Sequence, residues 1–343
     1  MNVGWWRWVV VAPGLLVGMY GCGGKDGGVC GRDASEDFKC GEFADTPAFH
    51  VCEDDSQSPP SESCVSLGDS GDYCCPYGSG GGSGVVPAVP AFDSEVDPEG
   101  SADYAPDPTT TWQWQLTGTL NTSYPVDIYD VDLFETEPST IAALEADDKR
   151  VVCYFSAGSG ENWRPDYDDY APTALGNDLE GWAGERWLDV TDPTVLAVAV
   201  ARLDLAVDKG CDGVEPDNMD GFQNDSGFEL TYDHQLGFNR RIANEAHQRG
   251  LAVLLKNDLD QIGELIDYYD GALNEECFAY EECDAYAPFV DVGKPVFQVE
   301  YADNESGAEN LGARVCDAAR AAGFHTLILP WDLDDSFRVS CDD

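Results

Sequence analysis

The chain has 343 residues, of which 18 are basic and 66 acidic, giving a formal net charge of −48 at pH 7. So acidic a chain repels phosphate polymers, which excludes nucleic acid as a partner and favours a cationic one. Solubility or a salty habitat is the alternative explanation of the charge. Hydrophobic residues make up 43% of the chain, which excludes bulk disorder and allows one large domain with appendages.

Residues 1–21 have the organisation of a secretory signal peptide. Arg7 lies in a short n-region, and an apolar run from Val9 to Tyr20 follows that is too short to span a membrane. Cys22 then opens a glycine-rich tether, as in bacterial lipoproteins. We therefore expect an exported outer-membrane or cell-surface lipoprotein that meets the membrane only through lipid on Cys22. Without the lipid, the chain would be secreted.

Residues 22–77 contain the tether and a cysteine-rich segment. Six of the 13 cysteines lie between Cys30 and Cys75, among Gly, Ser, Pro and acidic residues. Such a segment cannot bury much core, which predicts a small module held by disulfides. Zinc is the alternative, but no C-x-x-C pair occurs here and export favours disulfides. Residues 78–111 are rich in Gly, Pro and Asp and predict a linker.

Over residues 112–343, short apolar segments alternate with helical patterns. Asp192 and Pro193 begin one helix, which Gly210 ends. Eight segments predict strands: Val126–Asp132, Arg150–Ser156, Arg186–Val190, Gly213–Asp217, Leu251–Asn257, Gly271–Glu275, Pro295–Tyr301 and His325–Pro330. The predicted fold is α/β, a (β/α)8 TIM barrel preceded by the Cys-rich disulfide module and linker. Trp112–Leu116 would be an additional strand or a plug.

An open doubly wound sheet is the alternative fold. It is disfavoured because no G-x-G-x-x-G motif follows the first predicted strand. The strand ends also carry acids rather than phosphate-binding glycines.

Polar, ionisable or aromatic residues stand at the carboxyl end of nearly every predicted strand, where barrel enzymes place their active sites. They are Asp130, Asp132, Ser156, Glu161, Asp189, Glu215, Asp217, Lys256, Asp258, Glu275, Glu276, Glu300, Tyr301, Trp331 and Asp332. Strand alternation turns Glu215 and Asp217 to one side, toward the barrel axis. Two carboxyl groups in one pocket, one ionised and one protonated, are what glycosidic-bond cleavage requires. Lys256 would keep one neighbouring acid ionised.

These residues favour a carboxylate hydrolase. The alternatives are a non-catalytic sugar- or metal-binding barrel and other barrel chemistry. Asp217–Gly221 matches only part of a calcium loop, the four histidines lack metal-binding spacing, and no G-x-S-x-G motif occurs. We therefore expect no metal and no cofactor.

Four cysteines of this region are expected in structural disulfides rather than as reactive thiols. Cys153 and Cys211 lie in predicted strands of an exported protein, where disulfides predominate. Cys277 and Cys283 are close enough in sequence to bridge the loop that follows Glu275.

Several longer motifs give residues from Trp112 to about Asp334 a family resemblance. The motifs are Val151–Ser159, Glu161–Asp166, Gly184–Asp189, Gly210–Gly221, Leu255–Asp258, Leu273–Phe278 and Glu300–Tyr301. Together they resemble glycoside hydrolase family 114, the endo-α-1,4-polygalactosaminidases. The resemblance implies a (β/α)8 barrel that cleaves α-1,4-linked galactosamine polymers internally, with retention of configuration.

The resemblance also implies roles for individual residues. Asp217 corresponds to the family's proposed nucleophile and Glu275 to its acid/base, with Glu215 and Glu276 as the nearest alternatives. The implied substrate-binding residues are Asp130, Asp189, Glu215, Asn218, Lys256, Glu276, Glu300 and Tyr301.

The expected partner is a cationic galactosamine-rich polysaccharide, bound by a monomer. Deacetylated galactosamine is a cation at neutral pH, and a pocket rimmed with acids would attract it. A barrel that binds amino-sugar polysaccharide without cutting it is the alternative function.

Overall fold

The computed structural model describes residues 94–342 and, before them, the backbone of six short strands. These are β1 (Tyr20–Gly21), β2 (Val29–Arg32), β3 (Phe38–Gly41), β4 (Val51–Cys52), β5 (Glu62–Ser66) and β6 (Asp72–Pro76). They form two antiparallel sheets, in the orders β1-β2-β3 and β4-β6-β5. The predicted signal peptide (apart from β1), Cys22 and the side chains of the cysteine-rich module lie outside the described residues. The chain divides into two units, Met1–Pro90 and Ala91–Asp343.

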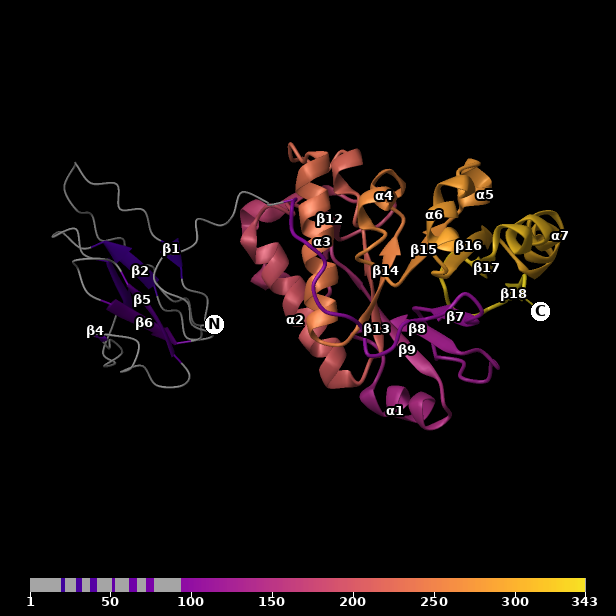
Figure 1. The fold of residues 1–343 in the computed structure, drawn as a ribbon, viewed down its shortest axis with the longest axis horizontal. Coiled ribbons are helices and arrows are strands. Elements are labelled where there is room, and N and C mark those ends of the chain that lie inside the picture. Colours follow the sequence, from indigo (N-terminus) through magenta and orange to yellow (C-terminus); the bar gives the residue numbers. More distant parts are fainter. Residues whose placement is uncertain are drawn as a thin grey trace, which may run out of the picture. The chain divides into compact units, whose positions relative to one another are not determined.

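The second unit is built on one curled nine-stranded sheet (Figure 1). Its parallel strands are β7 (Trp112–Gln115), β8 (Ile128–Asp132), β9 (Arg150–Ser156), β13 (Gly213–Asp217), β14 (Ala252–Lys256), β15 (Gly271–Glu275), β16 (Val296–Ala302) and β17 (Phe324–Pro330). They lie side by side in chain order, and β18 (Val339–Ser340) pairs antiparallel with β17. This α/β arrangement is consistent with a TIM-like barrel.

One apolar cluster fills the inside of the curl and joins its two ends. It includes Trp112 and Trp114 from β7 as well as Leu327 and Leu329 from β17. The Trp112 ring centroid lies 5.0 Å from that of Phe297 on β16. The Trp112 indole N–H donates to the carbonyl of His325, at 2.9 Å. The first and last parallel strands therefore share one core.

Helices cover the outer face of the sheet. The long ones are α1 (Pro138–Ala146), α2 (Pro193–Lys209), α3 (Tyr232–Gln248) and α7 (Glu305–Ala322), and the short ones are α4 (Ile262–Leu265), α5 (Cys277–Tyr280) and α6 (Ala287–Asp291). In Figure 1, α2 and α3 lie side by side, and α7 lies beside β17. Val214 on β13 joins the apolar cluster shared with α2 and α3. The neighbouring Glu215 points the other way, so the predicted alternation along β13 is confirmed.

The predicted limits of α2 are confirmed by its caps. The Asp192 carboxylate accepts a hydrogen bond from the backbone N–H of Thr194, and Pro193 occupies the first turn. Gly210 ends the helix with φ 91°, a left-handed conformation that favours glycine. Both signals act within a few residues of the helix ends, so they can be recognised from the sequence alone.

The third predicted barrel strand is wrong. Its residues form β12 (Glu185–Leu188), the central strand of a separate antiparallel sheet with β10 (Ser159–Glu161) and β11 (Leu175–Asp178). The Arg186 guanidinium donates to the carbonyl of Gly176, a polar contact that an apolar barrel wall would not offer. β7 instead takes a full place among the parallel strands, because Trp112 and Trp114 supply two large inward-facing apolar side chains.

Residues 94–111, which composition assigns to the linker, lie against the sheet-containing unit. The N–H of Glu99 donates to the Asn244 side chain on α3 at 2.9 Å, and the N–H of Asp103 donates to the carbonyl of Gly250 at 2.8 Å. Tyr268 donates its hydroxyl to the carbonyl of Val96. This part of the predicted linker is therefore an ordered strap.

The described residues contain three disulfides. Cys153–Cys211 and Cys277–Cys283 confirm that these cysteines are structural, and Cys316–Cys341 joins α7 to the C-terminal segment. Within residues 94–342, none of the helices is long and apolar enough to cross a membrane.

Candidate active site

One buried lysine holds three acids together at the carboxyl ends of β13, β14 and β15. The Nζ of Lys256 lies 2.8 Å from Glu215 Oε1, 3.1 Å from Asp217 Oδ1 and 3.2 Å from Glu275 Oε2. The side chains of Lys256 and Glu215 are 1% and 0% exposed, whereas those of Asp217 and Glu275 are 18% and 27% exposed. Asp217 and Glu275 therefore face solvent across the lysine, and Glu215 lies behind them.

Lys256 remains a cation despite its burial. Burial disfavours the ammonium ion, but the carboxylates of Asp217, Glu215 and Glu275 outweigh that effect and raise the pKa of Lys256 well above its usual value. Its Nζ also lies 4.9 Å from the ring centroid of Trp114 and so makes a cation–π contact. The fixed positive charge allows three acids to gather in one place.

Asp217 is oriented by three donors and a strained turn. Besides Lys256, the hydroxyl of Tyr154 donates to Oδ2 at 3.1 Å, and the N–H of Asn218 donates to Oδ1 at 2.8 Å. Asn218 has φ 61°, in the left-handed region. Its carbonyl closes on Gly158, where a Cβ atom would lie 1.7 Å from the Asn218 oxygen. Only glycine fits at position 158, so this contact fixes the turn that presents Asp217.

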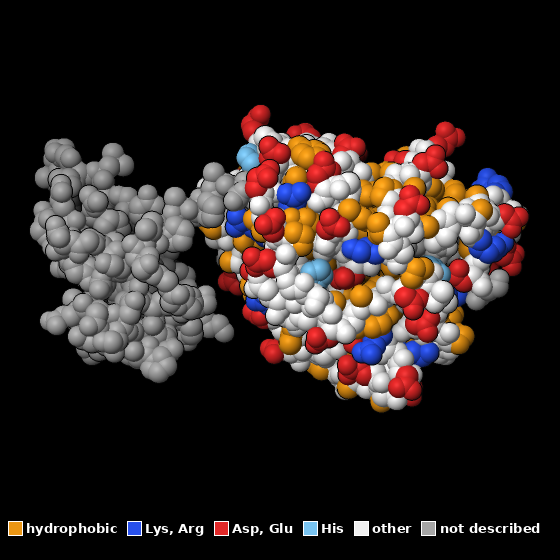
Figure 2. Space-filling model, viewed as in Figure 1, with side chains coloured by type: hydrophobic (Ala, Val, Ile, Leu, Met, Phe, Trp, Pro, Cys, Tyr) orange, Lys and Arg blue, Asp and Glu red, His pale blue; other side chains and the backbone are white. Residues whose placement is uncertain are grey.

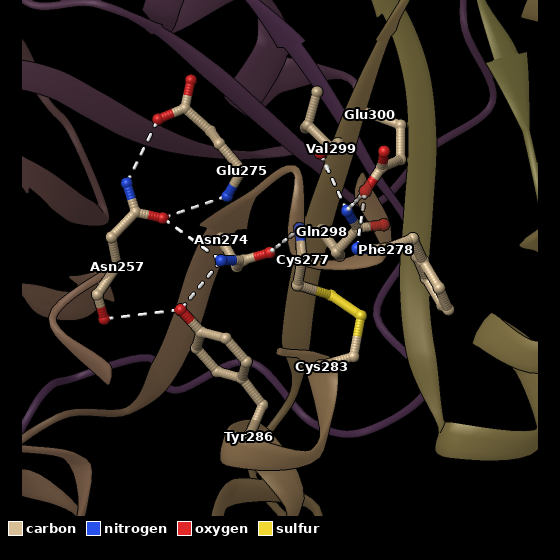
Figure 3. Close-up of a disulfide and its surroundings, with 10 residues drawn as sticks. All are labelled: Asn257, Asn274, Glu275, Cys277, Phe278, Cys283, Tyr286, Gln298, Val299 and Glu300. Carbon is tan, nitrogen blue, oxygen red and sulfur yellow. Dashed lines mark hydrogen bonds between the residues drawn. A yellow bond between two sulfur atoms is a disulfide. The ribbon is translucent and has the colours of Figure 1, made fainter. Parts of the chain in front are cut away.

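Glu275 is oriented in a similar way. Tyr301 donates its hydroxyl to Oε1, and the Asn257 side-chain amide donates to Oε2 at 3.3 Å. Figure 3 shows Asn257 beside Glu275, with the Asn257 oxygen accepting from the Glu275 N–H at 3.0 Å. The same oxygen accepts from the Asn274 amide, which also donates to the hydroxyl of Tyr286. Glu275 therefore stands on a buried amide network.

The loop after Glu275 is fixed by a disulfide and by Glu300 (Figure 3). The Glu300 carboxylate is 2% exposed and accepts from the N–H of Phe278 at 3.0 Å and from the Gln298 amide at 2.8 Å. Glu300, expected to contact substrate, thus lies under the loop. Glu276 has φ 61° and is half-buried, and burial and the nearby Glu275 charge raise its pKa.

Asp130 and Glu215 form a second, buried layer of acids. Asp130 is 1% exposed, and burial and the charge of Glu215 raise its pKa well above the usual range. This shift favours the protonated form of Asp130, whose two carboxylate oxygens have no hydrogen-bond partner among the described residues. Burial also raises the pKa of Glu215 to about 7, against the effect of Lys256. The Trp114 indole N–H donates to Glu215 Oε2 at 3.1 Å.

Asp189 and Glu185 lie at opposite ends of β12 and differ in burial. The Asp189 carboxylate, after β12, accepts from the N–H and hydroxyl of Thr191 at 3.0 and 2.6 Å. Glu185, at the start of β12, is 4% exposed, and burial raises its pKa to about 7. It accepts from the Ser159 hydroxyl and lies 3.4 Å from the amide of Asn218.

The sequence does not single out Glu185, because it begins a strand, whereas barrel enzymes place active residues at the carboxyl ends of strands. The motif Gly184–Asp189 contained it, but no local signal distinguishes a buried glutamate from an exposed one. The Asn218 amide donates to the hydroxyls of Ser156 and Ser159, at 2.9 and 3.2 Å. Asn218, expected to contact substrate, therefore has its side chain in this polar network.

The arrangement provides two solvent-facing carboxylates at short separation. One oxygen of each contacts Lys256 Nζ, at 3.1 and 3.2 Å. The distance between these two oxygens cannot exceed the sum of the two contact distances. The two carboxylates are therefore close enough to contact one bound molecule. The geometry suits one carboxylate as nucleophile and the other as acid and base.

Known proteins resemble this chain over most of its length. Residues 94–343 match Glycoside-hydrolase family GH114. The chain is 27% identical to an uncharacterized protein of Deinococcus radiodurans over 293 residues. The matched region covers 76% of this chain and 92% of that protein.

Solved structures also share the fold. Ega3 of Aspergillus fumigatus, determined in complex with galactosamine, is 43% identical with a TM-score of 0.67, covering 71% of this chain and 99% of Ega3. The glycoside hydrolase domain of PelA from Pseudomonas aeruginosa is 16% identical with a TM-score of 0.53, covering 67% of this chain and 98% of that domain.

Proposed function

Because the chain belongs to glycoside-hydrolase family GH114, we propose that it cleaves galactosamine-containing polysaccharide internally, at α-1,4 linkages, by a two-carboxylate retaining mechanism. The observation that carries the proposal is the placement of Asp217 and Glu275 across Lys256, both open to solvent. The 43% identity to Ega3, whose structure holds galactosamine, supports an amino sugar as the ligand.

In this mechanism Asp217 is the nucleophile. Its three donors hold the carboxylate in a single orientation. Asp217 attacks the anomeric carbon while the glycosidic bond breaks and Glu275 gives its proton to the leaving oxygen. The product of this step is a glycosyl ester on Asp217 and a shortened polymer.

The second step restores the enzyme. Glu275, now a carboxylate, takes a proton from the water that attacks the anomeric carbon and releases Asp217. The donors observed around Glu275 suit this basic form. In the acid form, Glu275 carries a proton, and Lys256 keeps its ion pairs with Glu215 and Asp217. The charge on Lys256 therefore acts on both catalytic groups.

Charge supports a cationic substrate. The chain carries a net charge of −48, and Figure 2 shows acidic side chains over much of the visible face, with fewer basic ones among them. An acidic surface raises the local concentration of a polycation and its rate of association. Free galactosamine units would therefore be bound in preference to N-acetylated ones.

We propose a chain with a signal peptide in residues 1–21, a tether and disulfide module in 22–77, and a linker in 78–111 whose part 94–111 is the ordered strap. A monomeric catalytic (β/α)8 barrel follows in 112–343. The three disulfides of the described residues support export to an oxidising compartment. The contact of Trp112 with His325 supports closure of the barrel between β7 and β17. Lipid on Cys22 would anchor the enzyme.

Separate measurements of binding and turnover test the function. The full chain, oxidised, and its Asp217→Asn and Glu275→Gln variants are compared on partly deacetylated α-1,4-galactosamine polymer. We expect each variant to bind within a few-fold of the native chain by calorimetry and to lose turnover by at least ~100-fold in a reducing-end assay. Glu276→Gln is the matched control and should retain turnover.

Two outcomes would overturn the proposal. If Glu276→Gln abolished turnover and Glu275→Gln did not, the acid/base assignment would be wrong. If the folded native chain bound the polymer but released no reducing ends, the non-catalytic binding barrel would be the function.

A further inference from the structure

An exposed tryptophan lies one side chain away from the proposed acid/base. Trp331 follows β17 directly and is 57% exposed. Its ring packs edge-on against Tyr301, with centroids 4.3 Å apart, and Tyr301 donates its hydroxyl to Glu275. A large apolar surface open to water beside a solvent-facing carboxylate is typical of a ligand-binding position.

The loop that carries Trp331 is fixed before any ligand binds. The N–H of Leu333 donates to the carbonyl of Pro330 at 3.0 Å. The carbonyl of Leu333 accepts from the N–H groups of Leu116 and Thr117 at 3.2 Å each, and the Thr117 hydroxyl donates to the carbonyl of Asp332 at 2.7 Å. The backbone around Trp331 is therefore bonded to the end of β7. A preordered indole loses little conformational entropy when it binds.

The contacts of Trp331 place it beside the proposed acid/base rather than beside the nucleophile. Trp331 packs on Tyr301, which donates its hydroxyl to Glu275, whereas Asp217 stands on β13, four strands away from β17 in the sheet. Because the acid/base protonates the leaving oxygen, the leaving sugar lies beside Glu275, the acid that Trp331 approaches.

We propose that Trp331 is the platform for the leaving-side galactosamine unit. The apolar face of the pyranose ring packs on the indole, and the exposed carboxylate of the next residue, Asp332, faces the ammonium group. This inference rests on the proposed function. The occupied platform also supports Tyr301 and thereby the orientation of Glu275.

Two other exposed tryptophans provide matched controls. Trp163 and Trp182 are 51% and 52% exposed, close to the exposure of Trp331. Trp163 follows β10, and Trp182 lies in the turn between β11 and β12. Both belong to the separate three-stranded sheet region, so their loss tests the general effect of removing an exposed indole.

The test uses the full chain and α-1,4-galactosamine oligomers of defined length. Trp331→Ala should raise KM at least tenfold, Trp331→Phe should restore most of the affinity, and Trp182→Ala should leave KM unchanged. The pH profile of kcat should stay in place in Trp331→Phe. In an Asp217→Asn background, calorimetry should show the same tenfold loss of oligomer binding for Trp331→Ala.

Asp332 is tested separately. Asp332→Asn should weaken the binding of free-amine oligomers severalfold and leave N-acetylated oligomers unaffected. An unchanged KM and unchanged binding in Trp331→Ala, or an equal loss in Trp182→Ala, would overturn the platform. A native chain that binds oligomers without cleaving them would contradict the proposed hydrolysis, and the binding measurements would still decide the role of Trp331.

Discussion

At the scale of residues, Lys256 determines what the neighbouring acids can do. Three carboxylates within 3.2 Å of one ammonium group would repel one another strongly without it. The ammonium group offsets this repulsion, so that Asp217, Glu215 and Glu275 can stand side by side. The same contact makes Lys256 a structural residue, because a buried charge without its partner is costly.

Replacing Lys256 with Met should destabilise the fold and abolish activity. Loss of one partner of a buried ion pair costs about 3–5 kcal/mol of unfolding free energy. The loss should be larger at pH 8 than at pH 5, because the carboxylates left behind accept protons at low pH. Urea denaturation at both pH values measures this effect.

Lys294→Met is the control for this substitution. Lys294 donates to the carbonyls of Ile266 and Tyr269 and contacts none of the three acids in the described structure. This variant should keep its activity and lose stability to a similar degree at both pH values. A pH-independent loss in Lys256→Met would contradict the role given to Lys256.

Replacing Glu185 with Gln should change the pH dependence of stability. Burial raises the pKa of Glu185 from 4.5 to about 7, so between these values the folded chain holds a proton that the unfolded chain has released. This group therefore lowers stability as pH rises from 4.5 to 7. Relative to the native chain, Glu185→Gln should gain up to about 3 kcal/mol between pH 5 and pH 8 in urea denaturation. A constant difference across that range would contradict the burial of an ionisable Glu185.

Part of this residue-scale description could be predicted from the sequence. The period-two pattern of Gly213–Asp217 placed Glu215 and Asp217 on one side, and both contact Lys256. The pattern could not predict which of the two is buried. Glu215 is fully buried because it comes two residues before Asp217, farther from the carboxyl end of β13. Glu185 reaches Asn218 from another sheet, a contact that only tertiary structure creates.

At the scale of elements, local signals predicted helices well and sheet membership less well. Caps such as Asp192 and Gly210 act within a few residues of the helix ends. The apolar residues of β12 resemble those of a barrel strand, but β12 pairs with β10 and β11 instead. The left-handed residues Asn218 and Asn257, which shape the site, gave no recognisable turn pattern.

Opening the disulfide after β15 should impair catalysis at a moderate cost in stability. The bridge between Cys277 and Cys283 spans a sequence separation of 6, so its loss costs only about 2–3 kcal/mol. The Cys277→Ser, Cys283→Ser variant loses the fixed loop beside Glu275 and should show a roughly tenfold lower kcat/KM.

The bridge between Cys316 and Cys341 is the matched control. Its sequence separation is 25, so the Cys316→Ser, Cys341→Ser variant should lose about 3–4 kcal/mol of stability but retain kcat/KM. Thermal melts and steady-state kinetics of both variants measure the difference. Full activity in the first variant and impaired activity in the second would contradict the positioning role of the loop.

At the scale of the whole molecule, four acids with little solvent exposure share one direction of pKa shift. Burial raises the pKa values of Glu185 and Glu215 to about 7, of Asp220 to about 6 and of Asp258 to about 9. Each acid then favours the folded state less as it ionises. The overall negative charge acts in the same direction, because it repels itself in the compact state.

His325 adds to this trend from the opposite end of β17. Both ring nitrogens lie 2.9 Å from oxygen acceptors, the Asp342 carboxylate and the carbonyl of Pro108, so the protonated ring can donate to both. Burial disfavours this cation, but these two contacts outweigh it and raise the pKa of His325. Its stabilisation is present below about 6.5 and is lost as pH rises through the raised value.

The unfolding free energy should therefore fall steadily from pH 5 to pH 9. Urea denaturation across this range measures the fall, and added salt should reduce the part due to surface repulsion. Asp258→Asn should flatten the curve between pH 7 and pH 9, because it removes the group with a pKa of about 9. A stability maximum at pH 8 or above would contradict this description of the buried acids.

Time-resolved mass spectrometry of the products most directly tests the central claim, that Asp217 and Glu275 act across Lys256 to cut a galactosamine polymer. The full chain, folded and oxidised, is incubated in ¹⁸O-water with partly deacetylated α-1,4-galactosamine polymer, beside Glu275→Gln. We predict oligomers of intermediate length at early times, each with one ¹⁸O at its new reducing end, from the native chain alone. An untouched polymer, or equal products from the Glu275→Gln variant, would contradict the account.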